Sequence, residues 1–130
     1  MVSEVRRAEP MDDWRRQDAA RQAHRRDLNE SIEARVSGRR PEPSVNAFVC
    51  ECGDPRCTRR VDLSSPEYET VRAYPNQFLI AANHENPEVE CVVTETKRFA
   101  VVQTLVGEAS KIALRTDPRA LHSGGTRASL

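Results

Sequence analysis

The first pattern along the chain is a polar stretch, residues 12–37, in which apolar or weakly polar side chains return at every fourth position. These recurring residues are Ala20, His24, Leu28, Ile32 and Val36. The stretch contains no Gly or Pro, and Asp12 and Asp13 suit the positive end of a helix dipole. We therefore expect one helix from Asp12 to about Ser37, whose narrow stripe packs against the domain or a partner helix.

A second pattern, between residues 45 and 116, consists of short apolar stretches separated by Pro, Gly and charged residues. Alternating or continuous apolar stretches of this length are typical of strands. The expected strands are residues 47–49, 61–63, 78–82, 89–96 and 99–105, the last two joined as a hairpin around Thr96-Lys97-Arg98.

Two short helices are expected among these strands. Ser64-Ser65-Pro66-Glu67 is a helix start, in which we expect Ser65 to cap and Pro66 to occupy the first turn. The second helix is expected over residues 108–115. The expected inward residues are Tyr68, Val71 and Tyr74 in the first helix and Ala109, Ile112 and Ala113 in the second.

These elements predict an α+β fold: a long N-terminal helix, then a small antiparallel sheet with two short helices and a zinc knuckle. We expect three segments. Residues 1–44 form the helix and a stiff Pro-containing linker (RRPEPS), and residues 45–116 form the zinc-binding α+β domain. Residues 117–130 form a disordered tail, since they are small, polar and contain glycine.

The composition suggests that the fold needs a stabilising cross-link, such as a bound metal ion or a disulfide. The chain has 130 residues, 20 Lys+Arg against 20 Asp+Glu, and only 38% hydrophobic residues. The balanced charge argues against bulk electrostatic attraction to nucleic acid or lipid, and the small core calls for extra stabilisation. No secretory leader or membrane-spanning run is visible, so we expect a cytoplasmic protein. Its thiols would stay reduced and favour metal over disulfides.

The candidate for this cross-link is the segment Cys50-Glu51-Cys52-Gly53-Asp54-Pro55-Arg56-Cys57, whose cysteines have the spacing C-x-C-x4-C. Zinc takes thiolate or imidazole ligands in a tetrahedron. The backbone must therefore bend after Cys52, where we expect a positive φ at Gly53 and a turn at Asp54-Pro55. A redox pair, Cys57 with Cys50 or Cys52, is the main alternative, and an iron–sulfur cluster fits the spacing less well.

A fourth ligand must come from elsewhere, and His84 is the preferred residue because it follows an expected strand on a loop. Cys91 is the second candidate, but it lies within an expected strand, where a buried cysteine usually acts as a small apolar residue. His24 and His122 lie in the helix and the tail. Glu51 and Asp54 are expected to be surface carboxylates unless they hydrogen-bond the ligands.

Two resemblances follow from these motifs. The segment Cys50–Arg59 resembles the post-SET zinc loop of lysine methyltransferases, which implies three zinc ligands at Cys50, Cys52 and Cys57. Nothing upstream resembles the SET catalytic core, so methyl transfer is not implied. Residues 25–119 also resemble a family of small proteins from high-GC Gram-positive bacteria, a resemblance that implies the folded unit but no activity. Its motifs here are F-x-C-E-C-x4-C, Y-E-x-V-R at 68–72, His84, P-E-V-E-x-V-V at 87–93, G-E-A at 107–109 and D-P-R at 117–119.

Three functions are compatible with the sequence. The first is a non-enzymatic, zinc-stabilised binding or regulatory module that contacts a protein partner, or a second copy, through the 12–37 helix. The second is a nucleic-acid-binding regulator that uses the helix arginines with Arg56, Arg59 and Arg60. The third is a zinc hydrolase with water in the fourth position and Glu51 or Glu85 as general base. We favour the first, since no catalytic motif is present and no catalytic residue is assigned.

Overall fold

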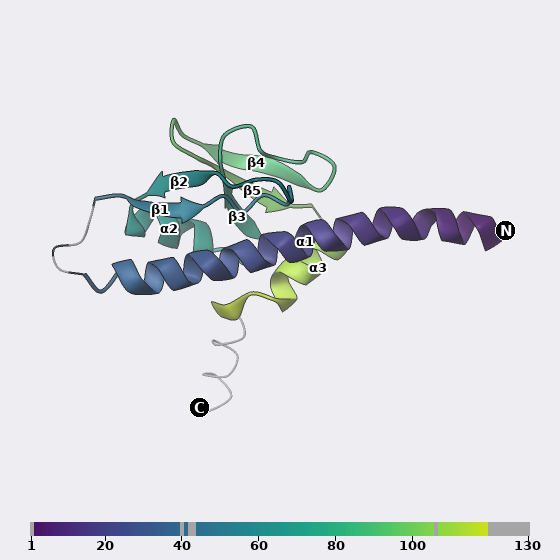
Figure 1. The fold of residues 1–130 in the computed structure, drawn as a ribbon, viewed down its shortest axis with the longest axis horizontal. Helices are drawn as coiled ribbons and strands as arrows, with labels where there is room; N and C mark the ends of the chain where they lie inside the picture. Colours follow the sequence, from purple (N-terminus) through teal and green to yellow (C-terminus); the bar gives the residue numbers. More distant parts are fainter. Residues whose placement is uncertain (1, 40, 42–43, 106, 120–130) are drawn as a thin grey trace, which may run out of the picture.

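A computed structural model describes residues 2–39, 41, 44–105 and 107–119. It shows the expected mixed α+β class: one long helix crosses the domain beneath the strands, and two short helices pack close by (Figure 1). The elements are α1 (Val2–Val36), β1 (Asn46–Val49), β2 (Arg60–Leu63), α2 (Ser65–Arg72), β3 (Gln77–Ile80), β4 (Glu90–Glu95), β5 (Ala100–Thr104) and α3 (Glu108–Arg115). The long helix begins at Val2 rather than at Asp12.

The strands form two antiparallel sheets rather than one. β1 pairs with β2, and β5 lies between β3 and β4, with an irregularity in β4 between Val92 and Thr94. The sheets meet where the chain leaves β1, because the Glu51 N–H donates to the Leu79 carbonyl at 2.7 Å. The expected hairpin between β4 and β5 is confirmed, closed by Thr96 N–H and the Phe99 carbonyl at 2.8 Å.

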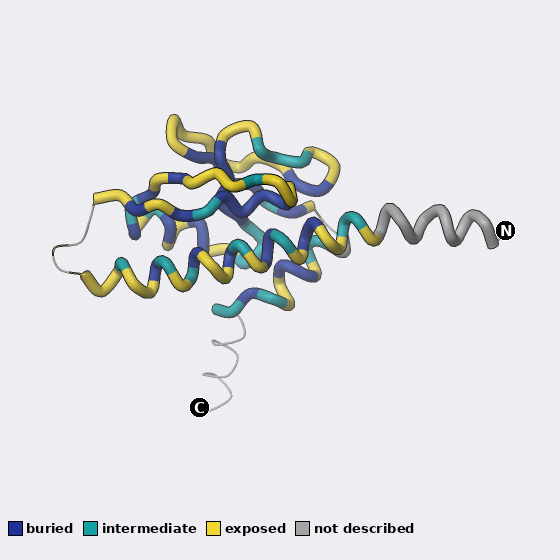
Figure 2. The backbone as a smooth tube through the Cα atoms, in the orientation of Figure 1, coloured by how far each residue is buried: buried dark blue, intermediate teal, exposed yellow. Residues whose placement is uncertain are grey.

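The core lies between the two sheets, α2 and α1, where the buried parts of the chain gather (Figure 2). Phe48 of β1 stacks on Tyr68 of α2, with ring centroids 4.6 Å apart and an interplanar angle of 5°. β3 and β5 complete this core with continuous buried stretches. The expected apolar strands therefore do form the centre of the domain, as their short continuous runs indicate.

The face of α1 that packs on the domain is not the expected one. Ala20 and His24 are exposed and Leu28 is 43% exposed, whereas the buried positions alternate in steps of three and four. This series is Ala19, Gln22, Arg26, Asn29 and Glu33, and Asp18 and Ala23 beside it are buried as well. Four residues span about 40° more than one full helical turn, so a stripe of residues at every fourth position winds gradually around the helix and away from the domain. Alternating steps of three and four keep one face toward the domain.

Polar side chains on this face are buried because each has a specific partner. Arg26 is fully buried, donates to the carbonyls of Pro75 (2.7 Å) and Ala113 (2.9 Å), and stacks over the Phe78 ring at 4.8 Å. Asn29 exchanges two hydrogen bonds with the Val49 backbone, at 2.8 and 2.7 Å. Hydrogen bonds to buried backbone offset the cost of burying such groups, so α1 attaches to the domain through polar contacts.

The two short helices begin near their expected starts. In α2 the cap is Ser64, not Ser65: Ser64 Oγ accepts from Glu67 N–H, and Glu67 accepts from Ser64 N–H, in a capping box. Ser65 instead donates to Glu33 of α1 at 2.6 Å.

The inward faces of the two short helices are mostly those expected. Tyr68 and Val71 are buried, but Tyr74 is 58% exposed because the helix ends at Arg72. In α3, Ile112 and Ala113 are buried and Ala109 is half-buried.

Packing continues beyond residue 116. Asp117 forms a buried ion pair with Arg72, and Arg119 pairs with Glu30 at 2.6 Å and with Glu69 at 2.8 Å. The first residues of the expected tail are therefore attached to α1 and α2, since their charges meet partners that lie far away in the sequence. Residues 120–130 lie outside the described residues.

Within the part of the chain that the structure describes, no helix combines the length and apolarity needed to cross a membrane.

Candidate metal centre

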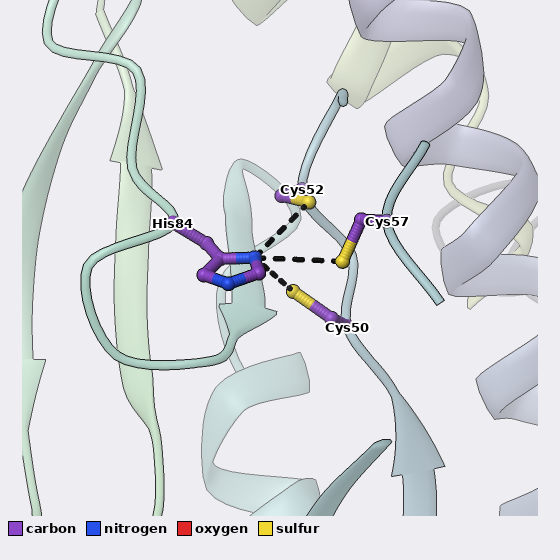
Figure 3. Close-up of side chains that lie close together, drawn as sticks. All are labelled: Cys50, Cys52, Cys57 and His84. Carbon is purple, nitrogen blue, oxygen red and sulfur yellow. Dashed lines mark hydrogen bonds between the residues drawn. The ribbon is translucent and has the colours of Figure 1, made fainter. Parts of the chain in front are cut away.

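Four side chains from two loops converge beside β1 and β3: Cys50, Cys52, Cys57 and His84 (Figure 3). Their ligand atoms all lie within 4.8 Å of one another. These are the four residues that the sequence analysis selected. They form a group that could hold a metal ion.

The first loop runs from the end of β1 to the start of β2 and carries the three cysteines. Cys50 N–H donates to the Arg59 carbonyl at 3.0 Å, which extends the β1–β2 pairing by one step. Within the loop, Cys57 N–H donates to the Asp54 carbonyl at 3.2 Å, and Arg56 N–H donates to Asp54 Oδ1 at 2.9 Å. This turn at Asp54-Pro55 returns Cys57 toward Cys50, as the sequence predicted.

Gly53 has a different role from the one expected. Its backbone is not in the left-handed region, so a positive φ is not what requires glycine. Gly53 is instead buried against Asp18 of α1, and its carbonyl accepts from Arg21 Nε at 2.6 Å. The limited space beneath α1 therefore favours glycine here.

The second loop delivers His84 directly after β3. Asn83 takes a left-handed conformation (φ 69°), and His84 N–H donates to the Ala81 carbonyl at 3.1 Å. An asparagine tolerates this backbone better than most side chains. Ala81 also donates its N–H to Cys50 Sγ at 3.2 Å, so the end of β3 contacts both loops of the site.

The three sulfur contacts of His84 Nδ1 cannot all be hydrogen bonds. Nδ1 lies 3.7 Å from Cys50 Sγ, 3.7 Å from Cys52 Sγ and 3.4 Å from Cys57 Sγ (Figure 3). A single ring nitrogen has either one hydrogen or one lone pair, so it cannot form three hydrogen bonds at once. No cysteine among the described residues is in a disulfide, so the sulfur atoms of Cys50, Cys52 and Cys57 are available to bind a metal ion as thiolates.

Neighbouring groups make the two thiols of the C-x-C pair unequal. The Cys52 side chain and then Ala81 N–H hold the pKa of the Cys50 thiol below its usual value by hydrogen bonding to the thiolate. The hydrogen bond to Cys50 and then burial raise the pKa of Cys52. Arg25 of α1 lies 3.7 Å from Cys52 Sγ and donates to the Cys52 carbonyl, which places a cation beside the cysteine loop.

Among the described residues, His24 and Cys91 do not join the group. Cys91 is exposed on β4, so it is neither a ligand in this arrangement nor the buried core residue that the alternating pattern suggested. Val92 and Val93 beside it are also exposed, because β4 is the outer strand of its sheet. His24 is exposed on α1, and His122 lies outside the described residues.

Glu51 is buried, whereas the sequence analysis placed it at the surface. It is fully buried, accepts from Asn29 Nδ2 at 2.7 Å and from Leu79 N–H at 2.9 Å, and joins α1 to β3 behind the cysteines. Burial raises its pKa to about 7, against these hydrogen bonds. Strand alternation was the available signal: if Cys50 and Cys52 point to one side, the residue between them points to the other, toward the core.

Asp54 is exposed, as expected for a surface carboxylate, and its side chain accepts a hydrogen bond from Arg56 N–H within the turn.

Comparisons with protein-family models, curated proteins and solved structures found no match.

Proposed function

We propose that this protein is a non-enzymatic, zinc-stabilised binding module that contacts a protein partner through α1. The observation that carries the metal assignment is the convergence of three Sγ atoms on His84 Nδ1 at 3.4–3.7 Å. Thiolate and imidazole atoms at about 2.0–2.3 Å from a tetrahedral zinc ion lie about 3.6 Å from one another. Thiolate and imidazole donors also favour zinc over harder ions such as Mg²⁺ or Ca²⁺, which prefer oxygen donors.

The position of the four residues supports a structural role for the ion. They join the end of β1, the start of β2 and the end of β3, and so span both sheets. Binding of structural zinc contributes on the order of 10 kcal/mol to the folding of small zinc-binding peptides. A chain with only 38% hydrophobic residues benefits from such a contribution.

The donor count supports a binding module over a hydrolase. Three cysteines and one histidine fill a tetrahedron and leave no position for a reactive water. Glu51, one candidate general base, is fully buried and hydrogen-bonded to Asn29 and Leu79 on the side of β3 and α1. It therefore could not deliver or accept a solvent proton at the metal.

The test is the metal content of the purified protein and of four variants, measured by elemental mass spectrometry. We expect one zinc per chain in the parent, loss of zinc in Cys50→Ser, Cys57→Ser and His84→Ala, and one zinc in Cys91→Ser. Cys91→Ser is the matched control because it removes a thiol outside the cluster. A chelator should also lower the melting temperature and reduce the circular dichroism signal.

Two results would overturn the proposal. Retention of stoichiometric zinc by Cys50→Ser and Cys57→Ser would show that the metal lies elsewhere. Retention by His84→Ala, with hydrolytic activity appearing in the parent, would favour an open coordination sphere.

A further inference from the structure

Beside the metal loop, a groove runs between α1 and the outer face of the β1–β2 hairpin. It consists of two hollows, of about 240 and 450 Å³, that share Arg60 as a lining residue. The first reaches the ligands Cys50 and Cys57, and the second continues along the C-terminal end of α1. The groove is therefore continuous with the candidate metal centre at one end.

The floor of this groove is apolar and comes from two elements. Leu28, Ile32 and Val36 of α1 line one side, and Ala47 and Val49 of β1 line the other. These α1 residues belong to the four-residue stripe that the sequence analysis identified and that the core leaves half-buried or exposed. From Leu28 to Val36 the helix advances about 12 Å, enough to contact about two turns of a docked helix. The stripe therefore contributes to an outer surface.

The rim of the groove is strongly basic. Arg25, Arg35, Arg39, Arg59 and Arg60 line the two hollows, and no described Asp or Glu does. The side chains of Arg35, Arg59 and Arg60 form no hydrogen bond or ion pair with any residue that the structure describes. In a chain whose total charge is zero, these five arginines concentrate positive charge along the groove.

We infer that the groove docks an acidic amphipathic segment of a partner protein, a surface that refines the proposed binding function and rests on it. Apolar side chains of the segment would cover Leu28, Ile32 and Val36, and its carboxylates would meet the arginine rim. This is the helix-in-groove mode of recognition, with charge setting the choice of partner. Because the metal loop forms one end of the groove, loss of zinc would deform the binding surface.

Two other occupants fit less well. Nucleic acid lacks a stacking platform here, since no aromatic side chain lines either hollow. A second copy docked by the same face would oppose arginines to arginines. A second copy could also offer its acidic surface, the hollow beside His84 lined by Asp18, Asp54 and Glu85, but that surface is concave and cannot enter a groove. The experiment therefore includes oligonucleotides and a measurement of dimerisation.

The experiment measures fluorescence anisotropy of labelled peptides with the zinc-loaded protein of 130 residues. The probes are a Glu/Leu amphipathic helical peptide, its Lys/Leu counterpart, an all-polar Glu-rich peptide, and single-stranded DNA and RNA oligonucleotides. We expect the Glu/Leu peptide to bind at least tenfold more tightly than every other probe. Binding should weaken with added salt, since the rim is charged.

The variants localise the binding. Arg35→Glu, Arg60→Glu and Leu28→Asp should each weaken Glu/Leu binding at least tenfold, with zinc content unchanged. Arg115→Glu is the matched control, since Arg115 is exposed on α3 away from the groove, and should bind as the parent does.

Each contrary result has a defined meaning. Equal binding of the Glu/Leu and Lys/Leu peptides, equal loss in Arg115→Glu, or tighter binding of an oligonucleotide would overturn the groove proposal. So would concentration-dependent dimerisation in sedimentation that Arg35→Glu abolishes. A chain stripped of zinc that still binds the Glu/Leu peptide would overturn the dependence of the groove on the metal. A zinc-loaded chain that does not bind the peptide would overturn the groove proposal and leave the metal proposal standing.

Discussion

Asp18 of α1 lies directly against Gly53 of the cysteine loop: a Cβ atom at position 53 would stand 1.7 Å from Asp18 Oδ1. Arg21, one turn further along α1, donates to the Gly53 carbonyl at 2.6 Å. The long helix thus packs directly on the cysteine loop, and the absence of a side chain at residue 53 allows this contact. Residues of α1 therefore help to position the cysteines.

Gly53→Ala should destabilise the protein by about 1–3 kcal/mol, since the new methyl group forces Asp18 or the loop to move. Urea unfolding measures the loss. Asp18→Ala combined with Gly53→Ala should recover most of it, because the added Cβ then has space. If the double variant is as unstable as Gly53→Ala alone, backbone conformation and not contact with Asp18 requires the glycine.

Arg26→Met should cost about 3 kcal/mol or more, because it leaves the buried carbonyls of Pro75 and Ala113 without their donor. Arg26→Lys should not restore stability, since one ammonium group cannot reproduce the guanidinium fork. Unfolding monitored by circular dichroism measures both. Arg115→Met on the exposed side of α3 is the control and should change stability by less than about 0.5 kcal/mol.

Glu33→Gln should become relatively more stabilising as the pH rises. Burial, and then the side chain of Glu69, raises the pKa of Glu33 from 4.5 to about 7. The folded chain therefore holds this proton more tightly than the unfolded chain, and the contribution of Glu33 is present at low pH and lost between about pH 4.5 and 7.

The difference in unfolding free energy, variant minus parent, should rise by roughly 2–3 kcal/mol from pH 5 to pH 8, because about two pH units of this range lie below the folded pKa. Taking this difference removes the pH dependence of the cysteines, which both proteins share. Glu95→Gln, on the exposed face of β4, should show a flat difference. A flat difference for Glu33→Gln as well would mean that Glu33 is ionised throughout this range.

A chain that ends at Arg119 should keep the parent stability, whereas a chain that ends at Thr116 should lose about 3–5 kcal/mol. The shorter chain leaves Arg72 buried without Asp117 and removes Arg119 from Glu30 and Glu69. Melting temperatures of the two truncated proteins measure the effect. Asp117→Asn in the full chain should reproduce most of the loss; equal stability of both truncations would contradict the role of this ion pair.

The sequence by itself determined the elements that depend on neighbouring residues. The capping box at Ser64 and Glu67, the alternation of β2 and the turn at Asp54-Pro55 all act within a few positions, and all could be predicted to within a residue or two. The three cysteines and His84 were also recognisable, because metal-ligand chemistry restricts the residue types and their spacing.

Tertiary structure decided which side of each element is buried and what role its polar residues have. Arg26, Asn29 and Glu51 are buried because partners 20 or more positions away complete their hydrogen bonds, and hydropathy along the chain cannot reveal such partners. The same contacts turn Leu28 outward. A buried polar group is stable only when a particular distant atom meets it, and that requirement exists only once the chain is folded.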